Sequence, residues 1–124
     1  MSTRDERPPV WVGHVTMQTD RLAESREFMI KLGMRPIADG EDFAVLELRG
    51  GTHLVLNRSD TTPAGSAPFD LMVDDLDVTH KKLSELGFSP SEIKSGRIHR
   101  SFEVKEPSGQ EITFNSSHVG KQPV

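Results

Sequence analysis

The sequence predicts an α+β domain made of two β-α-β-β-β modules, which form a curved mixed sheet with the helices on its outer face. The main observation is a weak internal repeat, in which Asp20-Arg21-Leu22 recurs 54 residues later as Asp74-Asp75-Leu76. In both copies a Leu-Gly pair follows, at Leu32-Gly33 and at Leu86-Gly87. A repeat of about half the chain indicates that one supersecondary unit is used twice.

Composition narrows the class of protein. A chain of 124 residues suits a single domain, and the lack of cysteine excludes disulfides, thiolate chemistry and Cys-ligated zinc. The net charge of −4 with mixed signs argues against a general nucleic-acid or acidic-membrane binder. No apolar run approaches the ~20 residues of a membrane span, and residues 1–9 lack the apolar core of a signal peptide. We therefore expect a soluble, cytoplasmic protein.

The first module is expected over residues 10–57, after a charged, Pro-rich arm at residues 1–9. The β-branched run 10–17 predicts a strand that places His14, Thr16 and Gln18 on one face. A helix over 21–32 is expected, with Thr19 or Asp20 as its cap and Gly33 as its stop. The remaining strands are expected at about 34–39, 43–48 and 53–56, with a Gly50-Gly51 turn.

The second module is expected over residues 67–116, after a linker at 58–66. Its helix should begin at Asp74 or Asp75, end at Gly87 and bury a stripe of Leu76, Leu83 and Leu86. Strands are expected at about 69–73, 88–93, 101–104 and 111–115, and residues 117–124 form a polar tail that contains His118.

A module of this kind covers one face of its sheet with its helix and leaves the concave face open. That face must close against a second sheet, from the same chain or from another copy. Inward side chains of the two sheets would then line a shared cavity, the kind of place where small molecules bind. Most of the phenylalanines are expected in the core.

Taken together, these pieces resemble the vicinal-oxygen-chelate superfamily, which covers glyoxalase I, extradiol dioxygenases, and the fosfomycin-resistance and bleomycin-resistance proteins. The resemblance spans roughly residues 10–116. It rests on Gly13-His14-Val15, the two Leu-Gly helix ends, the run 73–77 and the turn Pro107-Ser108-Gly109-Gln110. It implies the glyoxalase/bleomycin-resistance-like fold and says little about the reaction.

In metal-dependent relatives, four inward side chains ligate one divalent ion. The positions that match them here are His14, Val55, Pro68 and Thr113. The resemblance implies His14 as a ligand, but Val and Pro have no donor atom and a Thr hydroxyl is a poor ligand. The metal site is therefore expected to be atypical.

A shifted ligand set is an alternative. His53 and Glu111 lie two residues before the matched positions, so they face the same side of their strands. With His14 they would form a two-His, one-carboxylate set for a divalent metal such as iron, zinc, nickel or manganese. A shift of two residues moves a ligand by ~6.6 Å, which opposes convergence on one ion. The other interpretation is a polar cavity that binds no metal.

Other side chains are candidates for ligand binding. His14 could act as a catalytic base, because a neutral imidazole suits proton abstraction beside a carbonyl. His99, with Arg97 or Arg100, could meet an anionic ligand at the cavity rim, or the run could be an exposed charged loop. Thr113 and Glu111 should face the cavity, and His80, which lies on the second helix four residues after Leu76, should be a packing residue at the boundary of the apolar stripe.

Three classes of function follow. The first is a small-molecule binding protein of the bleomycin-resistance type, which needs no metal. The second is a metal-dependent glyoxalase-type lyase or isomerase, or an extradiol-type dioxygenase, in which the ion polarises vicinal oxygens. The third is an interaction or regulatory domain. A homodimer is expected, because family members commonly pair and because open sheet edges need covering.

Overall fold

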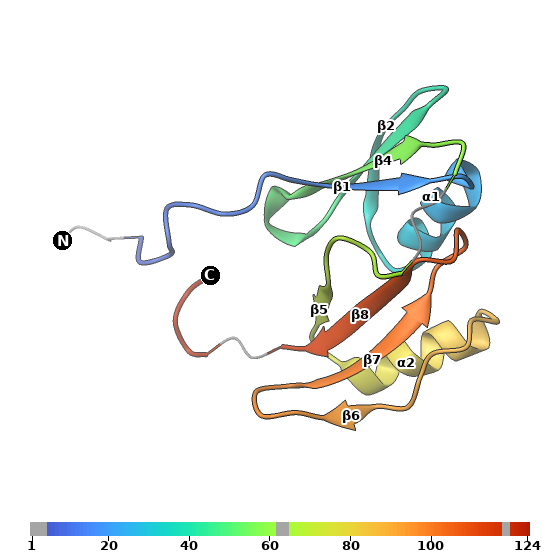
Figure 1. Cartoon of the computed structure of the whole chain (residues 1–124). Helices are drawn as coiled ribbons and strands as arrows, with labels where there is room; N and C mark the ends of the chain where they lie inside the picture. The colour runs from blue at the N-terminus through green and yellow to red at the C-terminus, as the bar shows by residue number, and fades with distance from the viewer. Residues whose placement is uncertain (1–4, 62–64, 118–119) are drawn as a thin grey trace.

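The structure is a computed structural model that describes residues 5–61, 65–117 and 120–124. The first module contains β1 (His14–Thr19), α1 (Leu22–Lys31), β2 (Arg35–Asp39), β3 (Phe43–Glu47), a 3₁₀ turn η1 (Arg49–Gly51) and β4 (His53–Arg58). The second contains β5 (Leu71–Val73), α2 (Leu76–Glu85), β6 (Lys94–Ser95), β7 (Arg100–Lys105) and β8 (Glu111–Ser116). This element order confirms the α+β prediction (Figure 1).

Each module forms its own four-stranded mixed sheet. The strand orders are β1-β4-β3-β2 and β5-β8-β7-β6, so the two modules share one topology. In each sheet the first strand runs parallel to the last, and the other pairs are antiparallel. In register, Met17 lies opposite Leu56, and Leu71 lies opposite Phe114. The repeat in the sequence is therefore a repeat of structure, laid out in two sheets within the described residues.

The first strand is shorter than expected. It begins at His14, and the exposed segment Val10-Trp11-Val12 continues outward as an extended arm (Figure 1). The reason is that β4 begins at His53, whose backbone N–H donates to the Gly13 carbonyl. Upstream of that bond the arm has no neighbouring strand to pair with, so its β-branched residues do not form one.

The second module departs from prediction at two places. The strand expected at 88–93 is wrong, since β6 covers only Lys94–Ser95. Ser91 nevertheless reaches β7, where its backbone N–H donates to the Glu103 carbonyl and its hydroxyl accepts from the Glu103 N–H. In α2 the expected stripe holds for Leu76 and Leu83, but Leu86 is 39% exposed, because it follows the helix as its C-terminal cap.

The two helix starts differ. The Asp75 side chain caps α2 by accepting a hydrogen bond of 3.0 Å from the Val78 N–H. The predicted cap of α1 at Thr19 or Asp20 is wrong, because Arg21 occupies the cap position and makes no side-chain cap. The Thr19 hydroxyl instead accepts from the Arg21 N–H, just before the helix. Both helices are followed by a glycine with positive φ, Gly33 and Gly87, as their sequence predicted. Neither helix in the described part of the chain is long and apolar enough to cross a membrane.

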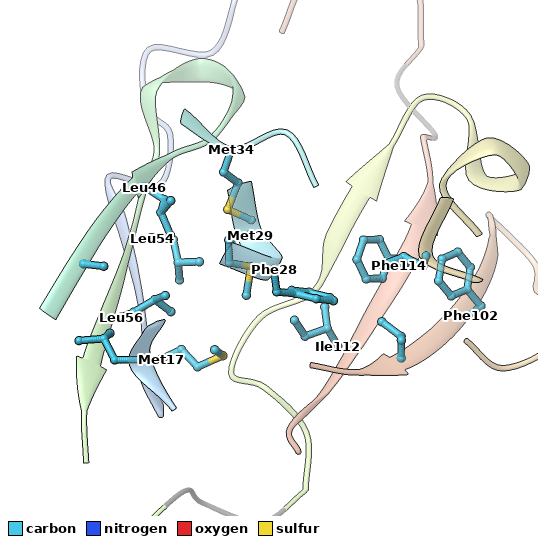
Figure 2. Packing of buried hydrophobic residues seen from close by; sticks show 14 of the residues in the cluster. Met17, Phe28, Met29, Met34, Leu46, Leu54, Leu56, Phe102, Ile112 and Phe114 are labelled. Carbon is cyan, nitrogen blue, oxygen red and sulfur yellow. The ribbon is translucent and has the colours of Figure 1, made fainter. Parts of the chain in front are cut away.

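A single hydrophobic cluster spans both modules. Phe28 and Met29 of α1 pack against the first sheet, and Phe28 points toward Ile112 of the second module (Figure 2). Phe28 also meets the Phe88 ring edge-on at 4.8 Å between centroids. The buried members are mostly Met, Leu and Phe: Met17, Leu22, Phe28, Met29, Met34, Ala44, Leu46, Leu54, Leu56, Leu76, Leu83, Phe102, Val104, Ile112 and Phe114. Phe43 is an exception to the expected burial of phenylalanines, at 40% exposure.

Candidate functional site

A row of polar residues crosses the first sheet, one from each strand. In register, His14 lies opposite His53, His53 opposite Glu47, and Glu47 opposite Arg35. We call His14, His53, Glu47 and Arg35 the polar row. Their strand neighbours Leu46 and Leu54 are fully buried in the cluster with α1, so alternation places the row on the opposite face. We call this the open face of the first sheet.

Glu47 connects the row electrostatically. Its Oε2 lies 3.0 Å from His53 Nε2, and its Oε1 pairs with the Arg35 guanidinium. The carboxylate is 19% exposed and His53 30%, so both side chains are half-buried. Hydrogen bonds from Arg35 first, and then from His53, hold the pKa of the Glu47 carboxyl below its ordinary value. Glu47 is therefore an ionised hydrogen-bond acceptor at neutral pH.

The two imidazoles of the row lie side by side. The His14 and His53 ring centroids are 5.6 Å apart, with the planes tilted by 60°. The parallel pairing of β1 with β4 brings them together, although they are far apart in the sequence. The sequence placed His14 and His53 on the same face by strand alternation, and the two rings do lie together there; their contact with a ligand stays a prediction.

Glu111 and Thr113 occupy the corresponding face of the second sheet. Both lie on β8 and alternate with the buried Ile112 and Phe114. On the same strand, Asn115 donates a hydrogen bond of 2.6 Å to Asp70. Hence the two sheets each carry polar side chains on the face away from their helices.

The remaining histidines are placed differently. His99 and Arg97 lie in the turn between β6 and β7, where His99 is half-buried and Arg97 exposed. Arg100 pairs with Asp77 of α2 at 2.9 Å, so its guanidinium is held by the helix. His80 packs edge-on to Phe102 at 5.0 Å and hydrogen-bonds the Ser91 carbonyl, as expected of a packing residue. His118 lies outside the described residues.

The described residues of one chain do not bring together the expected metal ligands. Among the described residues, no group of three or more His, Asp or Glu is placed to hold a metal ion. His14 and His53 come together, but Glu111 belongs to the other sheet. At the positions implied by the resemblance, Val55 and Pro68 have no donor atom. The set His14, His53 and Glu111 is thus not assembled in the described part of a single chain.

A hollow of about 490 Å³ lies elsewhere, between the N-terminal arm and the first module. Its lining includes Pro9, Trp11, Arg49, Thr52 and Val124, and it contains no member of the polar row. The hollow is therefore distinct from the cavity that the sequence predicted between sheets.

Sequence reasoning missed Glu47 and Arg35. Glu47 could have been found by counting outward from the Gly50-Gly51 turn, because the hairpin then sets it opposite His53. Arg35 could not have been placed in this way. The pairing of β2 with β3 shifts by one residue between Pro36 and Ala38, and nothing in the sequence marks that irregularity.

Comparison with solved structures shows what the fold is similar to. A lactoylglutathione lyase from Agrobacterium tumefaciens matches with a TM-score of 0.77 and 14% identity, over 94% of this chain and 100% of that one. A glyoxalase/bleomycin resistance protein/dioxygenase from Alicyclobacillus acidocaldarius matches with a TM-score of 0.68 and 22% identity, over 91% and 96%. At these identities the likeness establishes the fold alone.

Sequence comparison establishes the family. A comparison with curated proteins gave no match. Residues 11–114 match the sequence model of one family, and that stretch contains every described strand and both helices except the last two residues of β8. The chain belongs to the glyoxalase/bleomycin resistance protein/dioxygenase superfamily.

Proposed function

We propose that this protein binds a small molecule against the open face of the first sheet, around His14 and His53. One observation carries the proposal: two imidazoles stand in register on a face that the core does not use, with Glu47 bonded to one of them. Polar side chains that do not serve packing are candidates for ligand contacts. Glu111, Thr113, His99 and Arg97 of the second module are proposed as further ligand contacts, and His14 as the candidate base.

The donor set favours binding without a metal. Superfamily members often use a divalent ion, and four positions would be expected to supply its ligands. Here Val55 and Pro68 supply none, and Thr113 offers only a hydroxyl. What the row retains is hydrogen-bonding capacity from imidazole and carboxylate groups, which suits recognition of a polar organic molecule.

We further propose that the cavity is completed by a second copy of the chain. In the described residues β1 pairs with β4 alone, so its other edge is open, and the open face of the first sheet is uncovered by either helix. Open edges and open faces favour association. Sedimentation velocity should give a dimer, and a monomer at all concentrations would oppose this part of the proposal. A cytoplasmic location stays a prediction.

Binding can be tested by thermal-shift screening of a small-molecule library, since a ligand specific to the folded state raises the Tm. A hit should lose its effect in His14→Ala and His53→Ala but keep it in His80→Ala, because His80 packs in the second module away from the row. Compounds that raise the Tm of His14→Ala and His53→Ala as much as that of the wild type would contradict the proposed site.

A metal-dependent lyase or dioxygenase is the second candidate. The observation that favours it is the 5.6 Å separation of the His14 and His53 rings, since imidazoles are common ligands of zinc, iron and nickel. Elemental analysis of the purified protein decides between the candidates. A stoichiometric metal that is lost in His14→Ala would favour the enzyme, and metal-free protein that still binds its ligand would favour the binder.

A further inference from the structure

We propose that Glu47, anchored by Arg35, is a positioning residue that holds His53 with its proton on Nε2, so that Nδ1 accepts a hydrogen bond from a hydroxyl or enol of the ligand. This inference rests on the proposed function, because it concerns the same open face. It adds a ligand class, namely neutral molecules that carry a hydroxyl or enol group and donate a hydrogen bond through its O–H. It also assigns a role to two residues outside the matched metal positions.

The tautomer follows from the chemistry of the Glu47–His53 contact. An ionised carboxylate can only accept hydrogen bonds, and its oxygen lies 3.0 Å from His53 Nε2. Nε2 must therefore carry the proton that this contact needs. In a neutral imidazole the other nitrogen is then an acceptor, so Nδ1 has a lone pair to offer.

Arg35 keeps Glu47 in the form that this arrangement needs. Its guanidinium pairs with Oε1 while His53 engages Oε2, so each carboxylate oxygen has its own donor. The ion pair favours the charged carboxylate and restrains its rotation. The Arg35 side chain is 74% exposed. The positive charge that pairs with Glu47 therefore lies at the edge of the first sheet, on strand β2.

The groups that face His53 favour a ligand that donates a hydrogen bond to this imidazole. They are His14 from β1, Glu47 from β3 and, behind Glu47, Arg35 from β2. Within the described part of the chain, the one hydrogen bond of the His53 ring is the bond to Glu47. With Nε2 committed there, the ring can bind a ligand through Nδ1. A hydroxyl or enol matches that acceptor, whereas an ether oxygen does not.

The tautomer can be measured directly by long-range ¹H–¹⁵N correlation of the imidazoles at about pH 8, where an ordinary imidazole is neutral. In the wild type we expect His53 with the proton on Nε2. Glu47→Ala should produce a mixture of tautomers, and Glu47→Gln should restore the Nε2 form, because its amide oxygen still accepts. Glu27→Ala removes an exposed carboxylate that pairs with Arg26 on α1 and should leave His53 unchanged.

The ligand class is tested with phenol, which donates a hydrogen bond, and anisole, its methyl ether, which does not. Phenol should shift the His53 Nδ1 resonance, and its affinity should be about twofold weaker in Glu47→Ala, because an even mixture of tautomers leaves roughly half of the molecules with Nδ1 as an acceptor. Anisole should leave that resonance in place.

Two results would overturn the inference. One is a wild-type His53 with its proton on Nδ1, or a tautomer that Glu47→Ala does not alter. The other is an equal response to phenol and anisole. Either result would leave binding at the open face intact, which the library screen measures independently. Conversely, suppose that His53 carries its proton on Nε2 as expected, but the compounds found in the screen still raise the Tm of His14→Ala and His53→Ala. That result would count against the proposed function alone.

Discussion

The Ser25 hydroxyl donates a hydrogen bond of 2.9 Å to Glu106 Oε2, and this contact joins the two modules inside the protein. Ser25 lies in α1 and is fully buried, while Glu106 is 2% exposed in the turn between β7 and β8. The same carboxylate accepts from the Ser108 N–H, and the neighbouring Gln110 side chain donates to the Gln18 carbonyl. A buried polar link therefore supplements the hydrophobic cluster between the modules.

Removing the hydroxyl from this link should destabilise the protein. Ser25→Ala leaves a buried carboxylate short of a donor, which costs about 1–3 kcal/mol in the free energy of unfolding. Urea denaturation measures the change. Ser84→Ala is the matched control, because Ser84 is an exposed α2 serine whose hydroxyl bonds its own helix; its effect should stay within about 0.5 kcal/mol. Equal effects of the two substitutions would show that the inter-module bond adds nothing.

The aromatic contact between the modules should matter more. Phe28 is 2% exposed, so Phe28→Ala should cost about 3–5 kcal/mol through lost burial and a cavity. Phe43→Ala serves as the control, because Phe43 is 40% exposed and lies outside the core cluster. Thermal unfolding should show a large fall in Tm for the first variant and a small one for the second. A reversal of this order would mean that the modules pack differently.

The cap of α2 gives a local test. Asp75→Ala removes the acceptor of the Val78 N–H and should cost about 1 kcal/mol of stability. Asp75→Asn keeps an acceptor oxygen at the cap and should be nearly neutral. Chemical denaturation of the three proteins checks the order, and a loss in Asp75→Asn as large as in Asp75→Ala would exclude capping as the cause.

The ion pair between Asp77 and Arg100 predicts part of the response to acid. Hydrogen bonding to Arg100 lowers the pKa of the Asp77 carboxyl below its ordinary value of 3.8. The pair's contribution to stability is therefore complete above pH 3.8 and is lost as the pH falls through the lower pKa of the folded state. Since both side chains are largely exposed, the effect should be small and weakened by salt.

Asp77→Asn should accordingly lower the unfolding free energy slightly at pH 7, and this difference from the wild type should disappear as the pH falls below 3.8, which makes the pH dependence of the variant shallower. Arg100→Gln should give the same shallower dependence, because it removes the other partner. Denaturation curves between pH 2.5 and pH 7 provide the measurement. Variants that follow the wild-type pH dependence throughout would show that this pair does not contribute.

The sequence by itself determined the repeated module, the element order, the start of the second helix and the glycine that follows each helix, because these depend on local patterns; the predicted cap of the first helix did not hold. Apolar alternation, a capping Asp75 and a glycine after each helix act over a few residues, and they hold in the structure. The sequence also predicted that His14 and His53 point to the same side of the sheet, since strand alternation fixes the side on which each residue points.

Only the tertiary structure decided which groups surround His53 and at which residue the pairing of β1 with β4 begins. The polar row depends on four strands in one register, including a shift between Pro36 and Ala38 that brings Arg35 to Glu47. The expected strand over Val10-Trp11-Val12 failed because a strand needs a neighbour, and β4 ends its pairing at His53. Both outcomes depend on contacts between distant segments, and a local pattern carries no information on how such segments pair.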